Sequence, residues 1–150
     1  SMTLAISHKE ASTVVLDALR EVKPPFSPDQ VCSDFVATLK EYRVHVVTGD
    51  RYAGIWPEER FRVHGIRYDV AGAAKSDLYK ELLPLINSQR VELLDNDRLV
   101  NQLVALERRT SRGGRDSIDH GPRGHDDVAN ALAGVAYQAH NARFLFSDFL

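Results

Sequence analysis

The sequence has little of several features that mark specialised proteins. Cys32 is its single cysteine, so the chain forms no intrachain disulfide and offers no cysteine-based zinc site. No apolar run approaches the roughly 18 residues that a transmembrane helix needs. Six prolines and nine glycines are too few for a collagen-like or low-complexity chain. An excess of one charge is lacking too, because 19 Lys and Arg residues meet 21 Asp and Glu residues. The net charge of −2 excludes a strongly basic nucleic-acid-binding protein but leaves room for a local basic patch.

What the sequence does contain is typical of a globular protein. Of its 150 residues, 43% are apolar and 27% are charged. This length suits one domain with a sizeable buried core. We therefore expect a soluble, cytoplasmic domain over residues 1–150.

The first half of the chain predicts a hairpin, a helix and a parallel strand. Residues 3–8 and 12–19 are short apolar runs separated by a polar turn, which is typical of a β-hairpin. Ser27, Pro28 and Gln30 predict a helix start, and apolar residues at helical spacing follow. The β-branched run at residues 44–48 ends at Gly49 and Asp50 and predicts a buried parallel strand.

The second half predicts helices that alternate with short strands. Apolar residues at helical spacing predict helices at 76–86, 97–108 and 125–139, with Pro84 limiting the regularity of the first. A short helix is expected at 56–64, strands at 66–70 and 91–94, and a polar loop at 109–123. This order predicts an α/β fold, with a sheet of mixed direction flanked by helices.

Three carboxylates fall where α/β proteins place functional groups. Asp50 follows the end of a predicted buried strand, and Asp126 and Asp127 open the last helix. Each position also has an ordinary explanation, since Gly-Asp is common in turns and acidic residues cap helices. Taken together, they supply the oxygen ligands that Mg²⁺ or Mn²⁺ requires. The neighbouring His125 either orients water or phosphate or is an exposed histidine at a helix start.

A basic segment precedes the two carboxylates of the last helix, Asp126 and Asp127. Five arginines lie within sixteen residues, and glycines between them let the backbone approach a partner closely: Arg108, Arg109, Arg112, Arg115 and Arg123. A basic loop beside an acidic metal site lets an overall acidic domain hold a polyanion. The alternative is a solvated charged loop.

Other catalytic motifs are missing. Residues 72–76 (GAAKS) lack the leading glycine of a phosphate-binding loop, so Lys75 and Ser76 are expected to open a helix instead. The sequence has no Gly-x-Ser-x-Gly elbow, and Cys32 falls on an apolar helix stripe. A covalent nucleophile is therefore unsupported.

Two segments in combination identify a family. GDRYAG at residues 49–54 is followed by Trp56 and Phe61, and HDDVANA stands at residues 125–131. With the intervening LERRT at 106–110 and IDH at 118–120, the pattern resembles the C-terminal nuclease domain of bacteriophage terminase large subunits. The resemblance extends from Thr3 to about Ala139. It implies a ribonuclease H-like fold that cuts concatemeric double-stranded DNA with two divalent metals, Mg²⁺ or Mn²⁺.

The resemblance also assigns roles to residues. Asp50 matches the family's second acidic ligand, while Asp126 and Asp127 match its C-terminal acids, with the leading one of the two left open. Near neighbours are expected to support the metals or to contact DNA: His125, Asp119, Arg51, Arg109, Arg112 and Arg115.

The resemblance further predicts that this chain is a fragment. The family's first strand, with its aspartate, and the ATPase domain are expected to be absent. A second copy of the chain, or the apolar tail at residues 143–150, is then expected to cover the exposed sheet edge. The implied partners are double-stranded DNA and the terminase ATPase domain, small subunit and portal, in a bacterial host's cytoplasm. The alternatives are a non-catalytic DNA clamp or motor-docking module with an incomplete metal site and, more distantly, a junction resolvase or integrase core.

Overall fold

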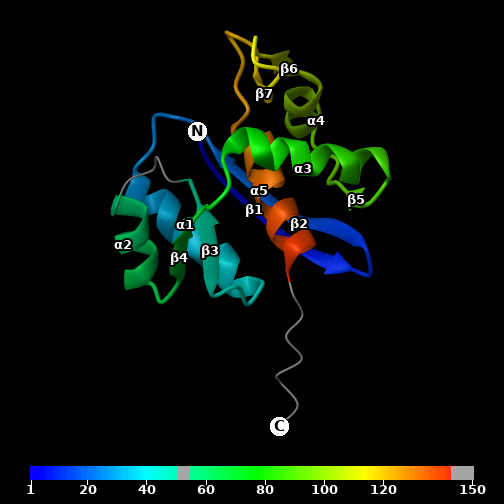
Figure 1. Ribbon diagram of the computed structural model, residues 1–150. Helices are drawn as coiled ribbons and strands as arrows, with labels where there is room; N and C mark the ends of the chain where they lie inside the picture. The colour runs from blue at the N-terminus through cyan, green and yellow to red at the C-terminus, as the bar shows by residue number, and fades with distance from the viewer. Residues whose placement is uncertain (51–54, 143–150) are drawn as a thin grey trace.

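The computed structural model describes residues 1–50 and 55–142 (Figure 1). Arg51 and the apolar tail at 143–150, for which the sequence suggested roles, lie outside these described residues. A long hairpin, formed by β1 (Met2–Glu10) and β2 (Thr13–Val22), crosses the centre of the molecule. None of the described helices is long and apolar enough to cross a membrane.

The hairpin predicted from the sequence is confirmed, and it connects two hydrophobic clusters. β1 and β2 pair antiparallel with a register shift at Ile6 and Ser7. Helix α5 (Asp127–Asn141) packs against both strands, as Figure 1 shows. Leu4 and Ile6 belong to the cluster around α1, whereas Ala5 packs against the cluster around α5. Successive side chains of β1 point to opposite faces of the hairpin and therefore pack in different hydrophobic clusters.

Helix α1 (Pro28–Glu41) begins as its sequence predicts. The Ser27 hydroxyl accepts a hydrogen bond from the Gln30 backbone N–H, and Pro28 occupies the first helical position. The apolar stripe of α1 is buried. Together with Leu4 and Ile6 it forms the cluster around α1, which is called the second cluster below. Burial of this stripe is the main source of the helix's stability.

The parallel pair beside α1 is confirmed in direction but not in burial. β3 (Val46–Gly49) pairs parallel with β4 (Arg67–Val70), and α2 (Ile55–Val63) connects the two strands. The prediction of a buried strand is wrong, because Val46 is 40% exposed. The reason is that β4 is the only described strand that pairs with β3, so the strand lies at an edge.

Helices α3 (Lys75–Asn87) and α4 (Asp97–Val104) flank the short strand β5 (Val91–Glu92). Pro84 is accommodated inside α3, which continues to Asn87. β5 pairs parallel with β2 and is shorter than predicted. Leu93 and Leu94 do not extend the strand. They pack against the hydrophobic cluster around α5, which is called the first cluster below.

The largest correction concerns the segment predicted as a polar loop. Residues 106–120 form an antiparallel hairpin, β6 (Leu106–Thr110) and β7 (Asp116–His120), and α4 ends at Val104 rather than at 108. Most of β6 is exposed, so apolar alternation could not reveal it. The Asp116 carboxylate accepts a hydrogen bond from the Thr110 hydroxyl at 2.7 Å and pairs with Arg108 at 3.0 Å. These cross-strand contacts replace the apolar pairs that usually hold a hairpin.

The α/β class with mixed strand direction is confirmed, but the strands are not joined into one sheet. Across residues 1–50 and 55–142 the hydrogen-bonded sheets are β1-β2-β5, β3-β4 and β6-β7. The first two are connected through packing on α1, since Leu4 of β1 and Val47 of β3 share the second cluster. Side-chain packing therefore joins them where backbone pairing was expected.

Candidate functional site

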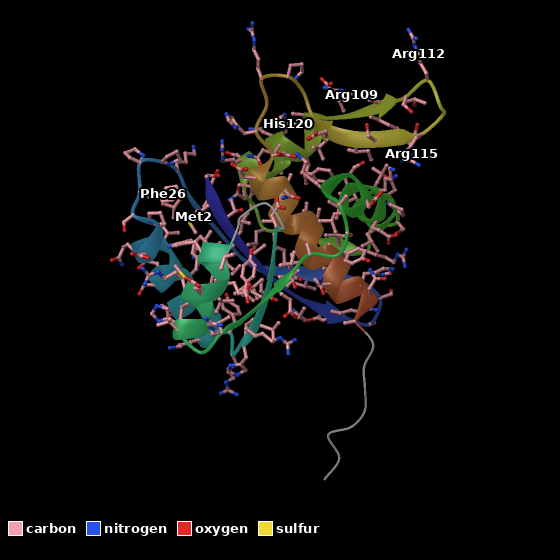
Figure 2. The ribbon with its side chains drawn as sticks, turned by 60° about the vertical axis from the view of Figure 1, so that its left-hand side comes forward. Met2, Phe26, Arg109, Arg112, Arg115 and His120 are labelled. Atoms are coloured by element: carbon pink, nitrogen blue, oxygen red, sulfur yellow. The ribbon has the colours of Figure 1, made fainter. Side chains whose placement is uncertain are left out.

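An acidic cluster lies where β7 approaches the start of α5. It consists of Asp119 and His120 at the end of β7 and Asp126 immediately before α5. One ligand atom from each residue lies within 4.8 Å of the other two. Figure 2 shows His120 at the base of the β6–β7 hairpin. Two carboxylates and an imidazole at this separation can hold a divalent metal.

Asp126 is buried and firmly held. Its carboxylate is 8% exposed, and the Tyr79 hydroxyl donates to Asp126 Oδ2 at 2.8 Å. Tyr79 is itself fully buried on α3. Burial raises the pKa of Tyr79 well above its usual range, and the neighbouring Asp126 carboxylate raises it further. The tyrosine therefore remains a hydrogen-bond donor to Asp126 at any physiological pH.

Lys75 bridges the two carboxylates of the cluster. Its Nζ lies 2.6 Å from Asp119 Oδ1 and 3.1 Å from Asp126 Oδ2. Burial alone would lower the pKa of Lys75, but the hydrogen bonds to Asp119 and Asp126 outweigh it and raise that pKa. Burial likewise tends to raise the pKa of Asp119, yet Lys75 and the His120 backbone N–H hold it below its usual value. Lys75 and Asp119 are therefore both charged at neutral pH.

The structure answers the question of whether Asp126 merely caps α5. Within the described residues its carboxylate makes no capping hydrogen bond. Gln102 of α4 performs that task, because its Oε1 accepts from the backbone N–H groups of Val128 and Ala129 at 2.9 and 3.0 Å. Two backbone N–H groups in the first turn of α5 therefore find their acceptor on another helix. The Asp126 carboxylate instead contacts Tyr79 and Lys75.

Asp127 faces a different partner. Its Oδ2 accepts hydrogen bonds from the Ser1 hydroxyl at 2.7 Å and from the Ser1 amino group at 3.0 Å. Burial acts to raise the pKa of Asp127, but these two donors hold it below its usual value. Asp127 is not a member of the Asp119, His120 and Asp126 cluster.

Asp50 lies immediately after β3 on an exposed part of the backbone, and its carbonyl oxygen accepts from the Tyr68 hydroxyl at 3.5 Å. Burial raises the pKa of Tyr68, and the Asp50 charge raises it further. Asp50 also stands outside the cluster. The structure therefore brings Asp126 and Asp119 together but does not bring Asp50 into the same group.

Three of the predicted basic residues, Arg109, Arg112 and Arg115, lie on the β6–β7 hairpin. Arg109 pairs with Glu107 at 3.1 Å along β6. Arg112 and Arg115 are exposed near the hairpin tip (Figure 2), and neither side chain forms an ion pair within the described part of the chain. His125 is exposed and lines a groove of about 380 Å³ together with Arg98 of α4.

Three residues of the site escaped the sequence reasoning as functional groups: Lys75, Tyr79 and His120. Lys75 was correctly expected to open a helix, but its contact with the acidic cluster was not anticipated. The available signal was the spacing of Lys75 and Tyr79, which places both on one face of α3. His120 follows Asp119 directly, so both were available as metal-binding residue types.

Comparisons with known proteins identify the fold. No protein-family model matches the sequence, and no curated protein sequence matches it. The crystal structure of the large terminase nuclease from thermophilic phage G20c aligns over 91% of this chain and 82% of its own, with a TM-score of 0.72 and 17% sequence identity. Structures of that nuclease with bound cobalt and with bound magnesium align with a TM-score of 0.71. The large terminase nuclease domain of Thermus phage P74-26 aligns over 95% of this chain and 82% of its own, with a TM-score of 0.72 and 17% identity. The chain thus has the fold of large terminase nuclease domains, as the sequence resemblance predicted.

Proposed function

We propose that this chain is the nuclease domain of a phage or prophage large terminase. It would cut concatemeric double-stranded DNA in a divalent-metal-dependent reaction during genome packaging, in the cytoplasm of a bacterial host. Its partners would be the terminase ATPase domain, the small subunit and the portal. The observation that carries the proposal is the Asp119, His120 and Asp126 cluster, in a fold whose solved examples include cobalt- and magnesium-bound structures.

The residues of the cluster fit a divalent metal. Tyr79 and Lys75 both contact Asp126 Oδ2, whereas Asp126 Oδ1 faces His120 Nε2 at 4.0 Å. Asp126 Oδ1, a carboxylate oxygen of Asp119 and His120 Nε2 would form the binding set. Carboxylates suit Mg²⁺ and Mn²⁺, and the imidazole ligand shifts the preference toward Mn²⁺ or Co²⁺. Such an ion supplies positive charge for a phosphodiester displacement and lowers the pKa of a coordinated water.

The protein groups around the cluster fix its geometry. The Tyr79 hydroxyl donates a hydrogen bond to the Asp126 carboxylate. Gln102 accepts hydrogen bonds from two backbone N–H groups at the start of α5, so the Asp126 carboxylate need not cap the helix. We assign Asp126 as the primary acid of the Asp126 and Asp127 pair, because its carboxylate lies in the cluster with Asp119 and His120. We also propose Asp50 as a further acidic ligand. It follows the carboxyl end of β3, the end of a parallel strand at which α/β proteins place functional groups.

The β6–β7 hairpin is the proposed contact with DNA. Arg112 and Arg115 extend into solvent near its tip, and Arg109 lies along β6 (Figure 2). Guanidinium groups bind phosphate oxygens and fix the register of a duplex without reading its sequence. Because β7 ends in Asp119 and His120, a duplex held by the hairpin would lie close to the acidic cluster.

The test is cleavage of plasmid and linear duplex DNA with Mn²⁺ or Mg²⁺. We expect metal-dependent cutting that Asp126→Asn and Asp50→Asn each abolish. Asp77→Asn is the matched control, because Asp77 is an exposed carboxylate on α3 outside the cluster. Cutting that survives Asp126→Asn would refute the assigned site. Salt-sensitive DNA retention without any cutting would instead indicate the clamp.

A further inference from the structure

Lys75 forms ion pairs with both carboxylates that the metal proposal requires. Its Nζ lies within ion-pair distance of both Asp119 Oδ1 and Asp126 Oδ2. The same Asp119 oxygen also accepts the His120 backbone N–H at 2.8 Å. In this arrangement one ammonium group compensates part of the charge of an acidic cluster whose ligand atoms lie within 4.8 Å of one another.

We propose that Lys75 is a tethered cation that competes with a divalent metal for Asp119 and Asp126, so that metal binding displaces its ammonium group. The inference rests on the proposed metal site. A divalent ion bound to both carboxylates would lie about 2 Å from each ligand oxygen. An ammonium group that kept its present contacts would then be within a few ångströms of the ion, where like charges repel strongly in a partly buried site.

The two groups that hold Asp126 differ in how easily they can leave. Tyr79 is 2% exposed and packed in the first hydrophobic cluster, so its hydroxyl stays on Asp126 Oδ2. The Lys75 side chain is 34% exposed, starts at the first residue of α3 and has a flexible four-carbon stem. Lys75 can therefore move into solvent while Tyr79 keeps the carboxylate in position.

The competition predicts a specific sign for one substitution. Lys75→Met keeps the length of the stem and removes the charge, so the carboxylates lose their internal counter-ion. Mn²⁺ should then bind at least about tenfold more tightly, because the metal no longer has to displace an ammonium group. Lys75→Arg, which keeps the charge, should bind Mn²⁺ far less tightly than Lys75→Met. A lysine that merely braced the carboxylates would give the opposite sign for Lys75→Met.

The experiment is isothermal titration of the whole chain with Mn²⁺ in the absence of DNA. The matched control is Lys80→Met, since Lys80 is on the same helix with a similar exposure of 37% and pairs loosely with Asp77 at 3.8 Å. We expect tighter binding in Lys75→Met and unchanged binding in Lys80→Met. Unchanged or weaker Mn²⁺ binding in Lys75→Met overturns the inference, as does the absence of Mn²⁺ binding in both the wild type and this variant.

A second measurement on the wild-type chain keeps the inference testable if Lys75→Met fails to fold. Amine acetylation at a limiting reagent concentration, read by mass spectrometry, reports how accessible Lys75 is relative to Lys80. Added Mn²⁺ should raise the labelling of Lys75 several-fold and leave that of Lys80 unchanged. Labelling of Lys75 that stays constant or falls overturns the inference. Neither measurement uses DNA, so a chain that binds Mn²⁺ in this way without cutting DNA refutes the proposed function and leaves the competition standing.

Discussion

The Tyr79 hydroxyl offers the sharpest test of how the acidic cluster is built. Tyr79→Phe removes the hydrogen bond to Asp126 Oδ2 at 2.8 Å and keeps the buried ring in its packing. A hydrogen bond to a charged group contributes about 1.5–3 kcal/mol, and Asp126 is too buried for water to replace the donor freely. We expect the free energy of unfolding to fall by that amount. For a domain of this length this corresponds to a fall in Tm of roughly 3–12 °C.

The assay is urea or thermal unfolding of the metal-free chain followed by circular dichroism. Tyr42→Phe is the matched control, because the Tyr42 hydroxyl donates at 3.4 Å to the Asp17 carbonyl on the exposed surface. The control should lose less than about 0.5 kcal/mol. An equal loss in both variants would refute the argument that Tyr79 holds a buried carboxylate. Tyr79→Phe should also weaken Mn²⁺ binding, which is opposite in sign to Lys75→Met, although both residues contact the same oxygen.

Three further outcomes are expected. Gln102→Leu leaves two backbone N–H groups at the start of α5 without acceptors and should cost about 2–4 kcal/mol of stability, measured by urea unfolding; a loss below 0.5 kcal/mol would contradict the capping role. Replacing Arg112 and Arg115 together by Ala should reduce the slope of log affinity for duplex DNA against log salt by about 2, and an unchanged slope would exclude the hairpin tip from the interface. Asp119 has a lowered pKa in the folded state, so its stabilising contribution is complete above the unfolded value near 4 and is lost as pH falls below it. Unfolding midpoints between pH 6 and pH 2.5 should therefore fall less steeply in Asp119→Asn, and parallel curves would contradict this.

The β6–β7 hairpin shows where pattern reading fails for physical reasons. A strand is recognisable in sequence when one face is apolar, because burial imposes a period of two residues. Most of β6 is exposed, and contacts of Asp116 with Thr110 and Arg108 help to hold the hairpin. The sequence singled out the arginines of this segment as a basic loop, but it did not predict that they lie on a two-stranded hairpin.

The candidate site divides in the same way. Asp126 was proposed as a metal ligand from its residue type and its position at a helix start, which are local properties, whereas Asp119 was named only as a supporting neighbour through the family resemblance. The cluster that they form depends on contacts between distant segments: Tyr79 reaches Asp126 across 47 positions, and Gln102 reaches Val128 across 26. The sequence also left Asp126 and Asp127 equivalent, whereas in the structure only Asp126 belongs to the cluster with Asp119 and His120.

The sequence by itself determined the opening hairpin, the amphipathic helices, the parallel strand before Asp50 and the resemblance to terminase nucleases. Each of these follows from short-range periodicity, from turn chemistry or from motifs read along the chain. The tertiary structure alone decided that Lys75 bridges Asp119 and Asp126 and that Gln102, not Asp126, accepts hydrogen bonds from the first turn of α5. It also decided that the described strands form separate sheets, of which β1-β2-β5 and β3-β4 are joined by packing on α1. These features depend on contacts between side chains that are far apart in the sequence. A local sequence pattern contains no information on which distant residues meet, so it could not predict them.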